Sequence, residues 1–106
     1  MTQDQVVALV TCPLERAEGF AQKLVQNRLA ACINIVPRVV SVYRWQGAVE
    51  KDDEALMIIK TSRLRLEAIE QCLAEIHPNE LFELITLPIT GGAQNYLDWI
   101  TAQTRS

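Results

Sequence analysis

One cysteine and one histidine are the candidates for metal chemistry in this chain. A thiolate and an imidazole together favour copper or zinc over magnesium or calcium, and Cys12 and His77 supply one of each. Glu80 and Glu83 follow the histidine closely, so their carboxylates are candidates to complete a ligand set. The structural alternative is that His77 lies at a helix end, where a cation is favoured, and that Cys12 is a turn thiol.

The other two cysteines, Cys32 and Cys72, are interpreted as small buried hydrophobic residues. An odd number of widely spaced cysteines makes no disulfide framework. No CxxC pair is present for thioredoxin-type redox chemistry or a zinc ribbon. Reduced thiols are typical of a reducing compartment, so we expect a cytoplasmic protein.

A second group of residues has the character of a small-molecule cleft at a subunit boundary. Aromatic bodies beside a few charges are typical of ligand clefts, although aromatics also dominate interfaces and cores. The group consists of Tyr43, Trp45, Lys60, Glu83, Tyr96 and Trp99.

The sequence offers little for catalysis. A Cys-His or Ser-His-Asp arrangement can use only His77, and Cys12 is the one plausible nucleophile beside it. An acylphosphatase-like enzyme needs a phosphate cradle and an arginine directly after the first strand, whereas residues 11–14 hold neither glycine nor arginine and Arg16 comes later. We expect no enzyme and no required cofactor, with acylphosphatase-like activity as the remaining alternative.

Length and composition limit the partners. A chain of 106 residues with 49% hydrophobic residues fits one folded domain, residues 1–106. No apolar run approaches the ~20 residues of a membrane span, and the polar segment 1–5 does not resemble a secretory signal. The formal charge of −3 argues against a nucleic acid or an anionic membrane as partner.

Hydrophobic periodicity predicts the elements that position these residues. Short β-branched runs indicate strands, and apolar residues three and four positions apart indicate two amphipathic helices, the second beginning at Ser62 as its N-cap and stopped by Pro78. Tyr96, Trp99 and Ile100 are expected to pack a closing helix on the sheet. Strands are predicted at 6–11, 32–36, 39–46, 55–61 and 84–89, helices at 17–28, 62–76 and around 96–100, and a charged reversal at 51–54.

Two β-α-β units in succession predict an α+β fold, the ferredoxin-like βαββαβ sandwich with a long β-ribbon and a short C-terminal helix. Its four strands form one antiparallel sheet with both main helices on one face and the first strand beside the last. This topology brings the end of the first strand and the end of the second helix to one edge. We therefore expect Cys12, His77, Glu80 and Glu83 to be neighbours.

The ribbon is too long for a small globule. Residues 31–50 would span roughly 65 Å if extended, whereas the expected diameter is about 33 Å. The ribbon must bend or project, and its outgoing arm outlasts the predicted return strand, which leaves unpaired backbone groups and exposed aromatic side chains. Because an exposed apolar edge invites another chain, we predict an obligate oligomer joined by strand pairing between subunits.

Six stretches carry a resemblance to a known family: RLAACIN (28–34), SVYRWQG (41–47), IKT (59–61), HP (77–78), LPI (87–89) and YLDWI (96–100). In this order they resemble the CutA family of divalent-cation tolerance proteins. The resemblance implies a ferredoxin-like subunit related to the PII proteins, in a tight homotrimer with ribbons paired between subunits. It also implies a role in heavy-metal tolerance or homeostasis, with copper as a candidate ligand. The alternative is a PII-like trimeric small-ligand sensor or interaction scaffold.

The sequence departs from the family pattern around its histidine. Asn79 stands where the family often has an aromatic residue, and Phe82 where it has proline. Members with proposed copper ligands use a cysteine in the first strand and a His-His pair. Here those positions hold Val10 and Ile76, so only His77 carries over. The resemblance therefore implies fold and assembly more directly than a metal site.

Overall fold

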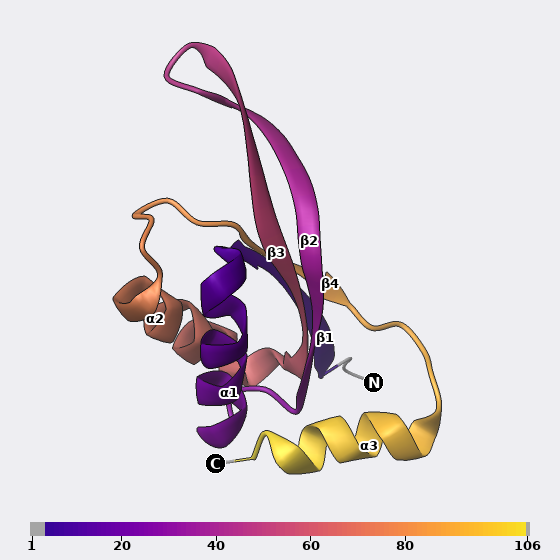
Figure 1. Ribbon diagram of the computed structural model, residues 1–106. Coiled ribbons are helices and arrows are strands. Elements are labelled where there is room, and N and C mark those ends of the chain that lie inside the picture. The colour runs from indigo at the N-terminus through magenta and orange to yellow at the C-terminus, as the bar shows by residue number, and fades with distance from the viewer. Residues whose placement is uncertain (1–3, 106) are drawn as a thin grey trace.

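The computed structural model describes residues 4–105 and has the predicted order of strands and helices (Figure 1). Short 3-10 turns at Leu14–Arg16 and Arg63–Arg65 lead into the first two helices. Residues 1–3, part of the segment expected not to be a secretory signal, lie outside the described residues. The elements are β1 (Gln5–Cys12), α1 (Ala17–Gln26), β2 (Cys32–Trp45), β3 (Ala48–Ser62), α2 (Leu66–Ile76), β4 (Leu84–Pro88) and α3 (Gln94–Gln103).

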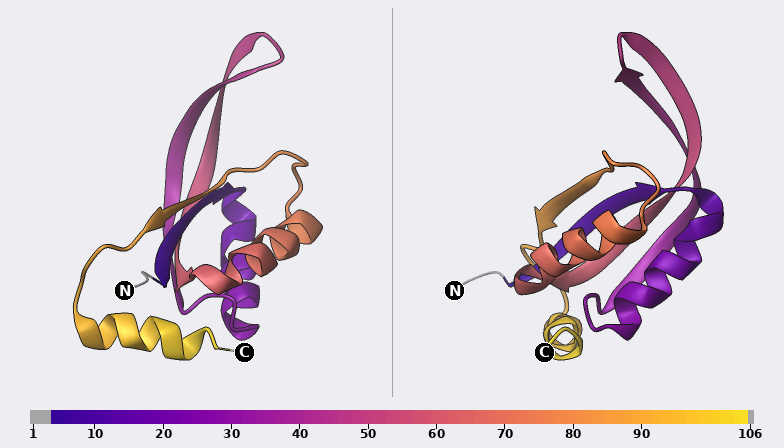
Figure 2. Two further views of the ribbon diagram at one scale, coloured as in Figure 1. Left: turned by 180° about the vertical axis from the view of Figure 1, so that it is seen from behind. Right: turned by 90° about the vertical axis from the view of Figure 1, so that its left-hand side faces the viewer.

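The four strands form one antiparallel sheet in the order β2-β3-β1-β4. This order confirms the ferredoxin-like prediction, with β1 between β3 and β4. Helices α1 and α2 cover the same face of the sheet (Figure 2). Pro88 ends the edge strand β4 opposite Val6, a position where its missing N–H disturbs the ladder least.

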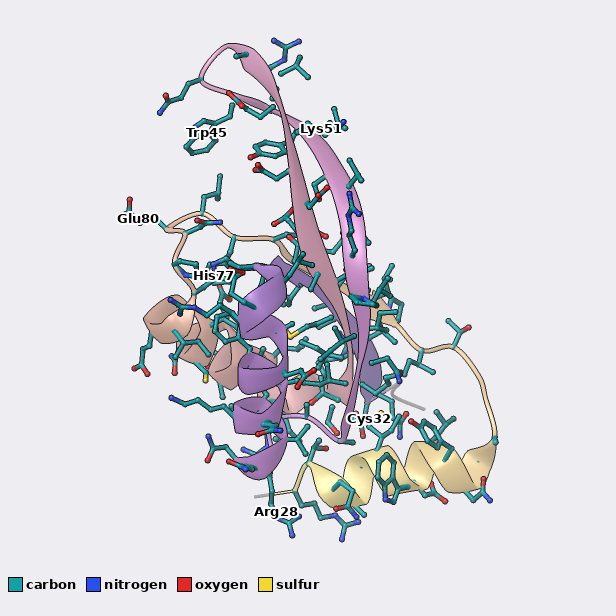
Figure 3. The ribbon with its side chains drawn as sticks, viewed as in Figure 1. Arg28, Cys32, Trp45, Lys51, His77 and Glu80 are labelled. Atoms are coloured by element: carbon teal, nitrogen blue, oxygen red, sulfur yellow. The ribbon has the colours of Figure 1, made fainter. Side chains whose placement is uncertain are left out.

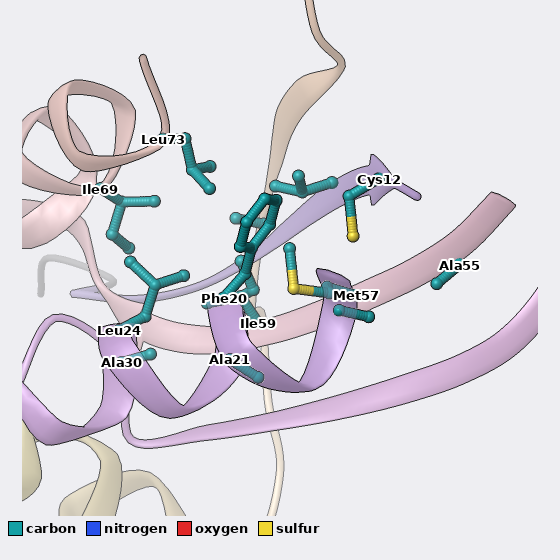
Figure 4. Close-up of a cluster of buried hydrophobic side chains, with 13 residues drawn as sticks. Cys12, Phe20, Ala21, Leu24, Ala30, Ala55, Met57, Ile59, Ile69 and Leu73 are labelled. Atoms are coloured by element: carbon teal, nitrogen blue, oxygen red, sulfur yellow. The ribbon is translucent and has the colours of Figure 1, made fainter. Parts of the chain in front are cut away.

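The core lies between this face and the two helices (Figure 4). Alternate residues of β1 point inward, so Val10 and Cys12 are fully buried while Leu9 is only half-buried. Helices α1 and α2 contribute large side chains at helical spacing to the same cluster. Its largest members are Phe20, Leu24, Met57, Ile59, Ile69 and Leu73.

Strands β2 and β3 form the long hairpin, and it projects as predicted (Figure 1). Strand β1 ends at Cys12 opposite Ala55, so the outer part of the hairpin has no third strand of the described chain beside it. The molecule therefore measures 44 × 25 × 22 Å. The ladder is interrupted between Val36 and Val39, around Pro37, which has no N–H to donate.

The predicted reversal at 51–54 is wrong. These residues belong to β3, and the chain reverses at Gln46 and Gly47, whose φ angles of 50° and 83° are those of a two-residue hairpin turn. The charged residues fit a strand because this part of the hairpin faces solvent. The two arms are consequently equal in reach, and the predicted unpaired surplus of the outgoing arm is also wrong. The unpaired backbone groups lie instead along the outer edges of the hairpin.

Two smaller predictions also need correction. The Ser62 side chain does not cap a helix, because its hydroxyl is hydrogen-bonded to that of Thr104. In the closing helix only Ile100 is fully buried. Tyr96 and Trp99 remain 42% and 40% exposed, because α3 lies across the end of the sheet (Figure 1) and leaves part of their surface uncovered.

Candidate functional site

His77 lies directly after α2 and is held on several sides. Its ring lies between Phe20 and Phe82, with centroid distances of 6.0 and 5.0 Å. The backbone N–H of Asn79 donates to Nδ1 at 3.1 Å, so the neutral ring carries its proton on Nε2 and donates to the carbonyl oxygen of Thr11 at 3.0 Å. Both ring nitrogens are therefore occupied by hydrogen bonds that tie this loop to the end of β1.

Cys12 follows Thr11, so the predicted neighbourhood exists, but the thiol faces the core and is fully buried. Burial raises its pKa from the ordinary 9.0 to about 11, and the carboxylates of Glu54 and Glu15 act in the same direction. The thiol is thus protonated at neutral pH. Within residues 4–105, no three or more His, Cys, Asp or Glu side chains lie close enough to hold a metal ion.

A groove of about 1090 Å³ lies between the projecting hairpin and the 77–83 loop. Trp45 projects from the hairpin on the side of this loop, which carries Glu80 (Figure 3). The residues that characterise the groove are Tyr43, Trp45, Asp52, Glu54, Glu80 and Glu83.

The groove is acidic. The hydroxyl group of Tyr43 donates a hydrogen bond to the carboxylate of Asp52. This bond, together with smaller contributions that include the charges of Glu50 and Glu54, raises the pKa of Tyr43 to about 12. Sequence reasoning missed Asp52 and Glu54, because residues 51–54 were assigned to a turn. With the turn placed at Gln46 and Gly47, their alternation along one strand face would have revealed them.

The six predicted cleft residues separate into two groups. Tyr43, Trp45 and Glu83 line the groove between the hairpin and the 77–83 loop. The other three, the root group, lie at the end of the hairpin opposite its turn. Lys60 is there on β3, paired with Cys32 of β2, and Tyr96 and Trp99 are on α3. Within one chain, the structure therefore does not bring all six into a single cleft.

Two residues of this root group, Lys60 and Tyr96, contact Cys32, which the sequence predicts only as a small buried hydrophobic residue. Lys60 Nζ lies 4.0 Å from Cys32 Sγ, and burial together with a hydrogen bond to Cys32 raises the pKa of Tyr96. The Tyr96 and Trp99 rings are 5.4 Å apart. Cys32 is only half-buried. Its contacts with Lys60 and Tyr96 join residues far apart in the sequence, so no local pattern predicts them.

The face of the sheet opposite α1 and α2 is apolar and largely uncovered. The register places Leu9 between Ile58 and Ile85, and Val7 opposite Leu87, all on this face. Ile85 and Leu87 are 52% and 48% exposed. Contiguous exposed apolar surface of this kind marks an interaction site. None of the helices in residues 4–105 has the length and apolar character needed to cross a membrane.

Comparison with known proteins gives consistent matches over nearly the whole chain. Residues 6–103 match the family described as CutA1 divalent ion tolerance protein. The mouse protein named "Protein CutA" is 42% identical over 100 residues, which are 93% of this chain but 56% of the mouse protein. The chain thus spans little more than half the length of that relative.

Solved structures agree with the fold. The divalent cation tolerance protein Cut A1 from Thermus thermophilus superposes with a TM-score of 0.93 at 41% identity, over 95% of this chain and 99% of that one. The structure titled "PII-like protein CutA" from Nostoc gives a TM-score of 0.88 at 30% identity, over 94% of this chain and 97% of that one.

Proposed function

Because this chain belongs to the CutA1 divalent ion tolerance family, we propose that it works as a homotrimeric divalent-cation tolerance protein in the response to heavy metals. The observation that carries the assembly is the uncovered apolar face of the sheet, with Ile85 and Leu87 half-exposed on it. Burying such a face is the main favourable contribution to association. The protein works in the cytoplasm, where its three cysteines stay reduced.

The projecting hairpin supports the same assembly. Beyond Cys12 and Ala55 its outer edges carry backbone donors and acceptors that no other described strand pairs. An unpaired edge is a template for a strand of another chain. Three copies that pair their hairpins with neighbouring subunits satisfy these groups, which one subunit cannot do alone.

The role is a non-enzymatic one. A Cys–His pair needs a free basic nitrogen, but both nitrogens of His77 are hydrogen-bonded to the backbone and the Cys12 thiol is buried. An acylphosphatase-like reaction lacks support as well, because the turn after β1 begins Pro13-Leu14 and offers no glycine-rich phosphate cradle. Acyl-phosphate hydrolysis is therefore expected to be negligible.

Metal binding through Cys12 and His77 requires completion by another subunit. Copper or zinc is the class that fits these ligands, and binding has to displace the thiol proton and one hydrogen bond of the imidazole. The experiment is light scattering followed by copper titration of the same sample, with Cys12→Ser as the test variant and Cys72→Ser as its control.

We expect a particle with three times the 11.9 kDa mass of one chain and a loss of copper binding only in Cys12→Ser. A monomeric particle at micromolar concentration overturns the assembly. Identical titration curves for all three proteins remove Cys12 from the metal site.

A second candidate is a trimeric small-ligand sensor, which the 1090 Å³ groove favours. In a trimer, the two groups of cleft residues can come from different copies. One copy would supply Lys60, Tyr96 and Trp99, and its neighbour would supply Tyr43, Trp45 and Glu83. A cleft between subunits could then contain all six residues, although they lie apart in one chain. A thermal-shift screen against metabolites tests this function, and stabilisation by none of them contradicts it.

A further inference from the structure

The first residue of β2 brings a thiol, an ammonium group and a phenol together. Cys32 is paired with Lys60 in the ladder, and Lys60 Nζ donates a hydrogen bond to Cys32 Sγ at 4.0 Å. The hydroxyl group of Tyr96 on α3 is also hydrogen-bonded to this sulfur. Cys32 lies where β2 begins, beside α3 (Figure 3), and both Cys32 and Lys60 are half-buried. The sulfur therefore has two polar neighbours and remains open to small molecules.

The ammonium group beside this sulfur has no carboxylate partner. Within residues 4–105 the printed ion pair joins Arg38 and Asp53, and Lys60 takes part in none. On β1, Lys60 is paired with the apolar residue Val7. No acidic side chain therefore draws Nζ away from Cys32, and the thiol is the polar group that Nζ contacts.

The other two cysteines lie on the opposite side of the sheet. Cys12 is fully buried in the core beneath the helices, and Cys72 packs against the same core from α2. Ile33 also packs against this core, so its neighbour Cys32 points to the other face, because successive residues of a strand alternate. All three thiols are free. Within the described chain, the sheet prevents Cys32 from forming a disulfide with Cys12 or Cys72.

An oxidised Cys32 consequently has a lysine nitrogen, and no thiol of its own chain, as its neighbour. A hydroperoxide converts a cysteine to a sulfenic acid, which then condenses with a thiol or with a nitrogen. The thiolate is the form that attacks the peroxide, and a neighbouring ammonium group stabilises a thiolate. Lys60 Nζ can thus assist the oxidation of Cys32 first and react with its product afterwards.

We propose that Cys32 and Lys60 form a reversible covalent bond, a sulfenamide between Sγ and Nζ, when a hydroperoxide oxidises the thiol. With hydrogen peroxide, one oxygen atom is transferred to Sγ and the other leaves as water. The ammonium group then loses a proton to solvent, and the Nζ lone pair attacks the sulfur. The S–O bond breaks, and the departing hydroxide takes a proton from the nitrogen and leaves as a second water. The sulfur is oxidised by two electrons, and the peroxide is reduced by two.

The bond ties the start of β2 to β3 and removes one positive charge from the uncovered face of the sheet. A dithiol reverses it by supplying two electrons and two protons, which regenerates the thiol and the amine while the dithiol becomes a disulfide. The reaction makes this end of the hairpin sensitive to peroxide. It goes beyond the proposed assembly and metal role and depends on neither of them.

The experiment is mass spectrometry of the full chain after treatment with a small excess of hydrogen peroxide. Hydrogen peroxide is little larger than water, so it reaches half-buried side chains. We expect a loss of about 2 Da, the mass of two hydrogen atoms, and a return to the parent mass after dithiothreitol. Trypsin does not cut after a substituted lysine, so digestion without reductant should give residues 29–38 joined to residues 52–63.

Matched variants test the two partners. Lys60→Arg keeps the positive charge and removes the primary amine, so we expect no joined peptide and a gain of about 16 or 32 Da on Cys32 from added oxygen. Lys51→Arg makes the same change on β3 opposite Val42, where no cysteine is paired, and should keep the joined peptide. Cys32→Ser should abolish the product, whereas Cys72→Ser should retain it. Circular dichroism checks that each variant is folded.

Three results overturn the proposal. One is oxygen added to Cys32 of the parent chain without any joined peptide. Another is a loss of about 2 Da that persists in Lys60→Arg, which places the sulfur on a backbone nitrogen. The third is a product of twice the chain mass that dithiothreitol separates, which shows a disulfide between two copies. Light scattering on the untreated sample reports the trimer separately, so its failure is not confused with these results.

Discussion

The side chain of His77 works as a clamp in the single chain. Its two hydrogen bonds, to the Thr11 carbonyl and from the Asn79 amide, hold the loop that forms one wall of the groove. Both departures from the family pattern contact it, because Phe82 stacks on the ring and Asn79 supplies the amide. His77 therefore has a structural role in the single chain, while Glu80 and Glu83 line the groove.

Cys12 makes the stability of the protein depend on pH. Its pKa rises from 9.0 in an ordinary setting to about 11 in the folded chain. Between these values the unfolded chain releases the thiol proton while the folded chain keeps it. The contribution of this group to stability is therefore complete below about pH 9 and is lost as the pH rises through 11.

We expect Cys12→Ala to flatten this dependence. Denaturant unfolding at pH 8 and pH 10 should show a smaller loss of stability in the variant than in the parent chain. Cys72→Ala, which removes a half-buried thiol at another place in the fold, controls for the general effects of alkaline pH. An equal loss of unfolding free energy between pH 8 and pH 10 in the parent chain and both variants would contradict a raised pKa for Cys12.

The hairpin depends on its turn. Gln46 and Gly47 both have positive φ angles, which the two-residue turn requires and which a residue with a Cβ adopts only at a cost. An added Cβ at Gly47 meets no atom within 4 Å, so its cost comes from the backbone angle of +83° alone.

We expect Gly47→Ala to destabilise the hairpin by about 1 kcal/mol. Hydrogen exchange measured by mass spectrometry should show roughly fivefold faster exchange in the hairpin. Gly91→Ala is the matched control, since Gly91 has equally open surroundings and no positive φ. Unchanged exchange in Gly47→Ala would place the turn elsewhere.

The molecule as a whole has one helix-covered face and one bare face. The bare face holds Leu9, Ile58 and Leu87, while the helix face holds the fully buried core. An antiparallel sheet can expose one face to water when that face is polar, but here the alternation gives apolar residues on both. This pattern is typical of a sheet that is buried in an assembly.

We expect Leu87→Glu to break the assembly and to leave the chain folded. Leu87 is 48% exposed in one subunit, so the substitution adds a charge to a surface that only another copy would bury. Light scattering should give the 11.9 kDa of one chain, with an unchanged circular dichroism spectrum.

Leu64→Glu is the control for that variant. Leu64 is 70% exposed in the 3-10 turn before α2, away from the bare face, and its variant should keep the mass of the parent. A parent mass in Leu87→Glu would show that this face does not join the subunits.

The elements and the topology followed from the sequence because their signals are local. The periodicities of α1, α2 and β1 depend on residues within a few positions of one another, and right-handed crossovers then leave few arrangements of the sheet. The projection of the hairpin followed as well, since the length of a strand can be counted. The position of the turn did not follow, because the four charged residues 51–54 resemble a solvated loop although they form part of β3, and the turn lies at Gln46 and Gly47.

The character of the site came from contacts between distant positions. The His77 ring is hydrogen-bonded to the carbonyl oxygen of Thr11, 66 residues away. The residues next to His77 in the sequence do not predict this bond. The burial of Cys12 and the separation of Tyr43 from Tyr96 likewise depend on how strands pair and helices pack. Side-chain chemistry responds to its three-dimensional surroundings. In the single chain, His77 is hydrogen-bonded to two backbone groups, the Cys12 thiol lies in the core, and Glu80 and Glu83 line the groove.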